Sequence, residues 1–455
     1  MRRQEIEKRL MAQHLVDFDE HDLPANPLDE LDVLNHYGFA GRRDMTDRFR
    51  ILTVNDHSFG NETLLMAVQL LGTDGLVVHY DPFLETLELV RRRAETLQLS
   101  ERIRFTADLE GLLHSLRETA TEAEQAHRFG HFDYVRCCGA LDRASNPAAL
   151  LDLMLAFLKE DGVLGMSCLG YYGRETYRQL QSLARLLDEE KGDWKQEMVL
   201  LKELYQFAAP TFWPMMAFEN LDPALRAMSD EGFLAEVMRE DCFALRVPEL
   251  YEWLDNRDLH LAQFSRHTRA FYQPWFANRR PELAERFGTL SKRQLQAVSE
   301  IAWNNIERHQ FWASRLPNTR PDFQDPDNIP FFNYFTNRSH GWRRYLVELP
   351  PDAPLDITVQ ISPRERYTLR AAWNAITRRF VTLVDGYKTF GEIAVVIREE
   401  SRLGLEEIVD VCAAFLKAVE WEDIILLRGR DTSLLPFTAK QLRLENESFR
   451  FAVHQ

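Results

Sequence analysis

Acidic and polar residues stand where successive predicted strands end. Residues 51–54 (ILTV) form an apolar run typical of a buried strand, and the polar loop 55–61 follows it. Asp81 comes just after a second apolar run, residues 76–78. In an open parallel sheet, ligands bind outside the carboxyl ends of the strands, and an acidic residue after the second strand commonly holds a ribose hydroxyl. This pattern predicts a site for a cofactor that carries a ribose.

Strand and helix patterns alternate from residue 49 to about residue 187. Such alternation indicates βαβ units and therefore predicts an α/β fold with a doubly wound, Rossmann-like sheet. Further strands are predicted at residues 102–106, 132–137 and 162–168, and helices at residues 82–97 and 149–158, with an inserted helix at 119–129.

The remaining chain divides by composition. Residues 188–315 read as a mainly helical region with few strand signals, and residues 317–330 are rich in Pro, Asp and Asn, as in a linker. A turn at Asp385-Gly386 precedes two amphipathic helical patterns. The predicted organisation is a helical lead-in (1–48), a Rossmann domain (49–187), a helical region (188–315), a linker with short strands (316–361), and a small C-terminal domain with its tail (362–455).

Charge and cysteine usage narrow the class of partner. The 455 residues include 55 basic and 71 acidic ones, and the formal net charge of -16 disfavours nucleic acid and anionic membranes as partners. The five cysteines form no CxxC pair, so we expect buried thiols and no metal site. The first residues lack the apolar core of a signal peptide, and no window predicts a membrane span, so we expect a cytoplasmic protein.

Asp133 opens a predicted strand, Gly139 follows it, Asn146-Pro147 begins a predicted helix, and the turn 159–162 leads into the next strand. In these features above all, residues 50–187 resemble the class I S-adenosylmethionine-dependent methyltransferases. A bacterial subgroup of this family has a helical second half, and the similarity to that subgroup continues to about residue 314. It is carried there by residues 229–232, 245–251 and 295–311. The C-terminal unit resembles winged-helix peptide-recognition domains, at Asp385-Gly386, Thr389, Glu392-Ile393 and Asp410-Val411.

The resemblance implies S-adenosyl-L-methionine as the cofactor. The family carries a GxGxG loop after the first strand; with Gly60 as the last glycine, Asp56 and Ser58 replace the first two. Asp81 and Asp108 would hold the ribose hydroxyls and the adenine amine, respectively. The implied cofactor-binding residues are Asp56, Ser58, Gly60, Asp81, Asp108 and Gly139.

Each of these residues also has a structural interpretation. Asp81 could be an ordinary turn aspartate, Asp108 a helix N-cap, and Asp56 a solvated loop residue. His57 could be a base or merely exposed, and Cys137-Cys138 a nucleophile or buried packing. Residues 171, 172 and 174 (Tyr, Tyr, Arg) could line a substrate entrance or simply pack. Methyl transfer depends mainly on positioning, so no catalytic residue is assigned.

Two functional hypotheses follow. The first is an active methyltransferase whose acceptor, a small molecule, peptide or protein, is unknown, with the C-terminal unit recruiting a partner or forming a homodimer. The second is a catalytically inactive methyltransferase-like protein that acts as a binding or regulatory module, which the changes at Asp56 and Ser58 favour. A nicotinamide oxidoreductase is disfavoured because GxGxxG is absent.

Overall fold

The structure is a computed structural model. It describes residues 31–54, 60–119, 131–187, 194–207, 230–233, 237, 243–275, 281–333, 342–360, 366–436, 438–440, 442–443 and 446. The predicted inserted helix at 119–129 falls almost wholly outside these ranges, as do most of the lead-in and the tail.

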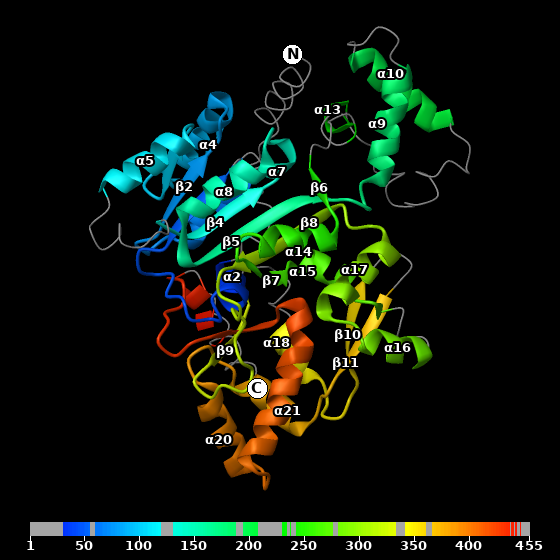
Figure 1. Cartoon of the computed structure of the whole chain (residues 1–455). Coiled ribbons are helices and arrows are strands. Elements are labelled where there is room, and N and C mark those ends of the chain that lie inside the picture. The colour runs from blue at the N-terminus through cyan, green and yellow to red at the C-terminus, as the bar shows by residue number, and fades with distance from the viewer. Residues whose placement is uncertain are drawn as a thin grey trace.

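The central sheet has the strand order β3-β2-β1-β4-β5-β8-β7, and β6 pairs with the end of β5 (Figure 1). The strands from β3 to β5 are mutually parallel, whereas β8 runs antiparallel to β5 and β7 antiparallel to β8. The strands are β1 (Arg50–Val54), β2 (Leu76–Tyr80), β3 (Ile103–Thr106), β4 (Phe132–Cys138), β5 (Leu158–Gly170), β6 (Ala244–Leu245), β7 (His260–Phe264) and β8 (Arg308–Ser314).

Alternate residues of each inner strand enter two different cores. On β1, Ile51 packs into one core with helices α2, α3 and α4, and Leu52 into the other with α5, α8 and α14. This period of two explains why the inner strands read as continuous apolar runs, since both faces are covered by helices. These helices and the short α7 are α2 (Leu31–Gly38), α3 (Asn61–Gln69), α4 (Leu84–Thr96), α5 (Leu109–Thr119), α7 (Ala140–Arg143), α8 (Pro147–Phe157) and α14 (Val247–Asp255).

The described residues between 188 and 315 lie mostly in helices, and they also supply β6, β7 and β8 to the sheet. The described helices between β5 and β8 are α9 (Glu175–Leu187), α10 (Trp194–Phe207), α13 (Asp230–Phe233), α14, α15 (Arg266–Arg269), η3 (Ala270–Tyr272), α16 (Pro281–Gly288) and α17 (Lys292–Trp303). In Figure 1, α9 and α10 lie at the end of the molecule toward which β5 runs.

The C-terminal unit lies at the other end of the molecule (Figure 1). Its elements are β9 (Ile329–Phe332), α18 (Trp342–Glu348), β10 (Leu355–Gln360), β11 (Arg366–Ala371), α19 (Ala375–Leu383), α20 (Phe390–Glu400), α21 (Leu405–Val419), η5 (Glu420–Glu422) and β12 (Ile425–Arg428). The two predicted amphipathic helices are α20 and α21. β9 pairs with β12, and β10 with β11.

The start of α20 shows why the turn motif was informative. Gly386 adopts a left-handed conformation with φ of 82°, and the Asp385 side chain accepts hydrogen bonds from the amides of Tyr387 and Lys388. Thr389 then caps the helix, and Glu392 bonds back to the Thr389 amide at 2.8 Å. This reciprocal pair is a capping box, which fixes where the helix begins.

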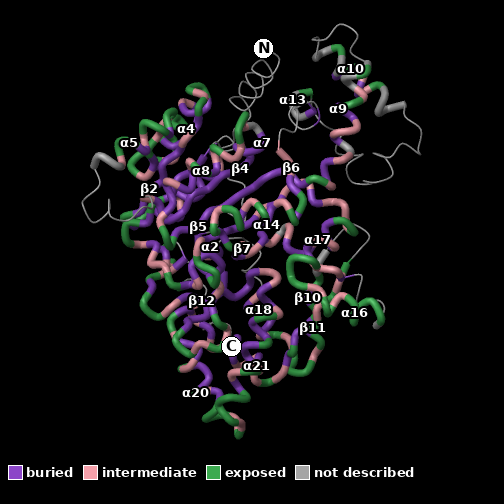
Figure 2. The backbone as a smooth tube through the Cα atoms, in the orientation of Figure 1, coloured by how far each residue is buried: buried purple, intermediate pink, exposed green. Residues whose placement is uncertain are grey.

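Helix α2 joins the sheet to the C-terminal unit. Its buried apolar residues belong to one core that extends from Ile51 on β1 to Phe415 on α21. Most of the α2 backbone is coloured as buried in Figure 2. Tyr37 of α2 stacks on Trp312 of β8, with ring centroids 5.8 Å apart, and donates a hydrogen bond of 2.6 Å to Asp423. The C-terminal unit therefore packs against the same core as the sheet.

A buried ion pair secures this junction. The guanidinium of Arg269, at the end of α15, bonds both oxygens of Asp423 at 2.6 Å and the Tyr37 hydroxyl at 2.7 Å. The Arg269 and Asp423 side chains are only 4% and 2% exposed. Because both charges are removed from water, each depends on the other for solvation.

Candidate functional site

The strand order reverses between β1 and β4, since β2 lies on one side of β1 and β4 on the other. In doubly wound sheets, ligands bind in the crevice that such a reversal opens at the carboxyl ends of the strands. Gly60 lies beyond the end of β1, Asp81 directly follows β2, and Gly139 directly follows β4. The structure thus brings three of the predicted site residues to one edge of the sheet.

Gly60 is the residue immediately before α3, with φ of 87°. A Cβ atom at this position would lie 2.5 Å from the side chain of Val90 on α4. Glycine is therefore required both for the left-handed backbone and for the close approach of α4. Asp56, Ser58 and His57 belong to the loop 55–59, which lies outside the described residues.

Substitution of Gly60 is expected to be costly. Gly60→Ala should lower the free energy of unfolding by roughly 2–4 kcal/mol, from the left-handed backbone and the overpacking against Val90. Gly288→Ala is the matched control, because a Cβ there meets nothing within 4 Å, and it should change stability by less than about 1 kcal/mol. Urea denaturation of both variants measures the difference, and equal effects would contradict this account of Gly60.

Asp81 is buried, with 1% of its surface exposed. Its Oδ1 atom accepts a hydrogen bond of 2.8 Å from the amide of Phe83, and its own amide donates to the Thr106 carbonyl at 3.2 Å. One carboxylate oxygen of Asp81 therefore has the role of a turn aspartate, which was one of the two predicted interpretations. A second role for the carboxylate is compatible with this bond, because a carboxylate accepts up to about four hydrogen bonds.

Asp108 follows β3 and is exposed. Its Oδ1 atom accepts a hydrogen bond of 2.9 Å from the Gly111 amide in the first turn of α5, so it acts as a helix cap. Burial raises the pKa of Tyr80, and the charges of Asp81 and Asp108 raise it further. The charges of Asp81 and Asp108 therefore both reach the hydroxyl of Tyr80, at the end of β2.

Gly139 ends β4 in a left-handed conformation with φ of 72°, and its amide donates to the Ser167 carbonyl at 2.9 Å. The neighbouring thiols of Cys137 and Cys138 are both buried. Burial raises the pKa of Cys137 to about 12, so this thiol stays protonated near neutral pH. A buried protonated thiol is a poor nucleophile, which favours the packing role for Cys137.

The residues after β5 bring aromatic rings and guanidinium groups together. The Tyr171 ring is 38% exposed and lies 4.1 Å from the guanidinium carbon of Arg178 and 5.1 Å from that of Arg246. Arg174 is buried, with its guanidinium carbon 3.8 Å from the centre of the Tyr177 ring. These contacts serve packing, and they also place the exposed face of Tyr171 beyond the end of β5.

Sequence reasoning missed an ion pair that lies beside Gly139. Asp142, fully buried on α7, accepts hydrogen bonds from the Leu169 amide at 3.1 Å and from Arg308 at 2.9 Å. Arg308 begins β8, whose place in the sheet was not predicted. The available signal in the sequence was an acidic residue, Asp142, three positions after Gly139, and this signal did not identify Arg308 as its partner.

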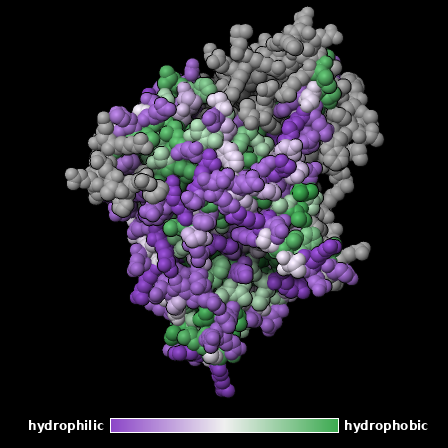
Figure 3. Space-filling model, in the orientation of Figure 1, coloured by the Kyte–Doolittle hydropathy of each residue, from purple (hydrophilic) through white to green (hydrophobic). Residues whose placement is uncertain are grey.

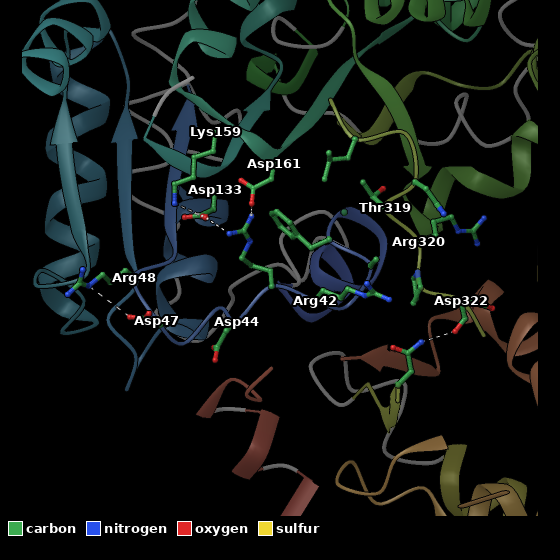
Figure 4. Close-up of a pocket in the computed structure, with 18 residues that line it drawn as sticks. Arg42, Asp44, Asp47, Arg48, Asp133, Lys159, Asp161, Thr319, Arg320 and Asp322 are labelled. Atoms are coloured by element: carbon green, nitrogen blue, oxygen red, sulfur yellow. Dashed lines mark hydrogen bonds and ion pairs between the residues drawn. The ribbon is translucent and has the colours of Figure 1, made fainter. Parts of the chain in front are cut away.

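A cavity of about 790 Å³ lies at the opposite, amino edge of the sheet (Figure 4). Asp133, at the start of β4, accepts a hydrogen bond from Lys159 at 2.9 Å and pairs with Arg43 at 3.4 Å, while Arg43 also pairs with Asp161. The charges of these four side chains neutralise one another. Because the cavity lies at the amino edge of the sheet, it is separate from the carboxyl edge that carries Asp81 and Gly139.

No protein-family model matches the chain. An uncharacterized protein of Synechococcus, syc1184_c, is 24% identical over 319 residues, which cover 67% of this chain and 70% of that protein. Two solved structures are similar over most of the chain: PKMT2 from Rickettsia typhi in complex with AdoHcy, and PKMT2 alone. The first has a TM-score of 0.58 at 12% identity and covers 90% of this chain and 76% of that one; the second has a TM-score of 0.57 at 12% identity and covers 89% and 75%.

The chain has the fold of a class I S-adenosylmethionine-dependent methyltransferase. The predicted α/β class and Rossmann-like sheet are confirmed, and the predicted cofactor agrees with the AdoHcy named for PKMT2. Among the described residues, no helix is both long and apolar enough to cross a bilayer. Hydrophilic residues cover most of the face seen in Figure 3, with hydrophobic ones in small groups.

Proposed function

We propose that this protein transfers a methyl group from S-adenosyl-L-methionine to a peptide or protein. The observation that carries the proposal is the placement of Gly60, Asp81 and Gly139 at the carboxyl ends of β1, β2 and β4, where the strand order reverses. Asp56, Ser58 and Asp108 complete the proposed set of cofactor-binding residues.

The described residues at this edge suit the cofactor. Gly60 and Gly139 have no side chain and positive φ, so backbone can approach a ligand closely at the ends of β1 and β4. Asp81 and Asp108 supply carboxylate oxygens, which accept hydrogen bonds from ribose hydroxyls and from an amine. When bound, the cofactor supplies an activated methyl group on a sulfonium.

The chain's own task would be to position the acceptor. A neutral nucleophile must lie in line with the carbon–sulfur bond, and water must be excluded. The chain's residues would hold the acceptor so that its nucleophilic atom faces that methyl group, and the proton that the acceptor gives up would pass to the solvent. The exposed ring of Tyr171 lies beyond the end of β5 and is our candidate for the acceptor entrance.

A protein acceptor is supported by the extent of the similarity to PKMT2, which reaches 90% of this chain and thus includes the helical region and the C-terminal unit. The name PKMT denotes a protein lysine methyltransferase, so the side-chain amine of lysine is the first acceptor to test. The C-terminal unit would then recruit the protein substrate or a second copy of the chain.

Calorimetric titration of the full chain with S-adenosylmethionine tests the proposal. We expect measurable heat and a raised melting temperature, and labelled methyl groups should appear on lysine-containing protein acceptors. No heat and no thermal shift at millimolar ligand would overturn it. Binding without transfer would favour the second candidate, a catalytically inactive binding module, which the replacement of two loop glycines by Asp56 and Ser58 supports.

A further inference from the structure

The first turn of α3 leads directly out of the loop that follows β1. This turn consists of Asn61, Glu62 and Thr63, and it begins immediately after Gly60. Each of the three side chains bonds to a different part of the fold. Their partners lie on α4, on β4, and on β1 with β2, respectively.

Glu62 forms a buried ion pair with Arg136 in the middle of β4. Glu62 Oε1 lies 2.6 Å from the Arg136 guanidinium, and the two side chains are 6% and 1% exposed. The pair therefore connects the helix that follows β1 to the strand that ends at Gly139, across the point where the strand order reverses.

Thr63 belongs to a buried hydrogen-bond network. Its hydroxyl lies 2.7 Å from His79 Nδ1 on β2 and 2.8 Å from the Thr53 hydroxyl on β1, and Thr53 lies 3.0 Å from the same imidazole nitrogen. All three residues are at most 1% exposed. Asp81 follows His79 by two positions, so this network also reaches the end of β2.

Asn61 completes the set. Its side-chain oxygen accepts a hydrogen bond from the guanidinium of Arg93 on α4, the helix whose Val90 also packs against Gly60. The turn is thus held against α4, β4, β1 and β2 at once. We call Asn61, Glu62 and Thr63, with their partners, the α3 clamp.

A buried ion pair is seldom the most stabilising choice at a site. Desolvation of both charges offsets most of their attraction, and well-packed apolar residues are often as stable. What the pair supplies is a fixed geometry, here at the exit of the predicted cofactor loop. A site works only when the supporting contacts hold it close to its productive geometry.

We propose that Glu62 and Thr63 are positioning residues for the cofactor: through the α3 clamp they hold Gly60, at the start of α3, in register with the ends of β2 and β4. This inference rests on the proposed function. Neither residue is assigned a part in the chemical step.

Two variants test the α3 clamp against a matched control. Glu62→Gln removes the charge and keeps the shape, and Thr63→Val removes the hydroxyl and keeps the shape. The control is Asp423→Asn, which disrupts a second buried arginine–carboxylate pair, likewise 2.6 Å long, at the C-terminal junction. Melting temperature and affinity for AdoHcy are measured for each protein.

We expect Glu62→Gln and Thr63→Val each to weaken AdoHcy binding by about 10- to 100-fold, as for a site displaced by an ångström or less. The control should lower the melting temperature and leave the affinity within about twofold. The methyltransferase assay should show a raised KM for S-adenosylmethionine with kcat largely kept. Should Glu62→Gln fail to fold, Thr63→Val, which retains every charge, decides the question.

The outcomes separate the two proposals. A wild-type protein that binds no AdoHcy overturns the proposed function. A wild-type protein that binds AdoHcy, with variants of unchanged affinity, overturns the inference alone. Equal losses of affinity in Glu62→Gln and in the control would also overturn it, because such losses would reflect general destabilisation.

Discussion

Asp81→Asn should weaken binding of AdoHcy by roughly 10- to 100-fold. The substitution keeps an oxygen that can accept from the Phe83 amide, so the turn after β2 survives while the negative charge is lost. Hydrogen bonds to a charged group contribute about 1.5–3 kcal/mol, and about 1.4 kcal/mol corresponds to a factor of ten. Calorimetric titration gives the two dissociation constants directly.

Asp108→Asn provides the comparison for Asp81. Asp108 is exposed, and water competes for its carboxylate, so we expect a loss of affinity below about fivefold. Equal effects at the two positions would contradict the different roles that their burial implies. An Asp81→Asn protein with wild-type affinity would show that this carboxylate serves only the turn.

The second large effect is expected at the junction of α2 and the C-terminal unit. Arg269→Met should lower the free energy of unfolding by about 3–5 kcal/mol, because it leaves Asp423 buried without a counter-charge. The Tyr37 hydroxyl, 2.6 Å from Asp423, replaces only a small part of that solvation. Urea denaturation measures the change.

A double variant distinguishes loss of a charge partner from loss of packing. In Arg269→Met with Asp423→Leu, neither charge remains buried, so the cost should be smaller than for Arg269→Met alone. A double variant as unstable as the sum of the single ones would assign the effect to packing. AdoHcy affinity should stay near that of the wild type, since the network joins α2, α15 and η5.

Local patterns were sufficient to predict the parallel half of the sheet. The apolar runs that became β1, β2 and β4 are short, buried on both faces and bounded by turn residues, so their positions followed from the sequence. Asp81 and Gly139 could be placed because each directly follows such a run. The capping box of Thr389 and Glu392, which fixes the start of α20, is local as well, since its contacts lie within one helical turn.

The antiparallel strands and the buried ion pair of the α3 clamp could not be predicted, because they depend on contacts between residues far apart in the sequence. β7 and β8 are short strands set among helical patterns, and β8 is completed by a partner on β5, far away in the sequence. Arg136 was a visible clue, because a charge between the apolar residues of a buried strand requires a buried counter-charge. Its partner, Glu62, lies 74 positions earlier, and no local pattern connects the two.

The antiparallel pairing of β5 with β8 has a consequence for synthesis on the ribosome. Until β8 has been made, after α9 to α17, the β5 segment has no neighbour on that side and exposes unpaired amide and carbonyl groups. In a fragment that stops at residue 187, β5 would remain an unpaired edge strand, and we expect such fragments to associate with one another. The sheet can therefore be completed only when the chain has been made through residue 314, after the helices that lie between β5 and β8.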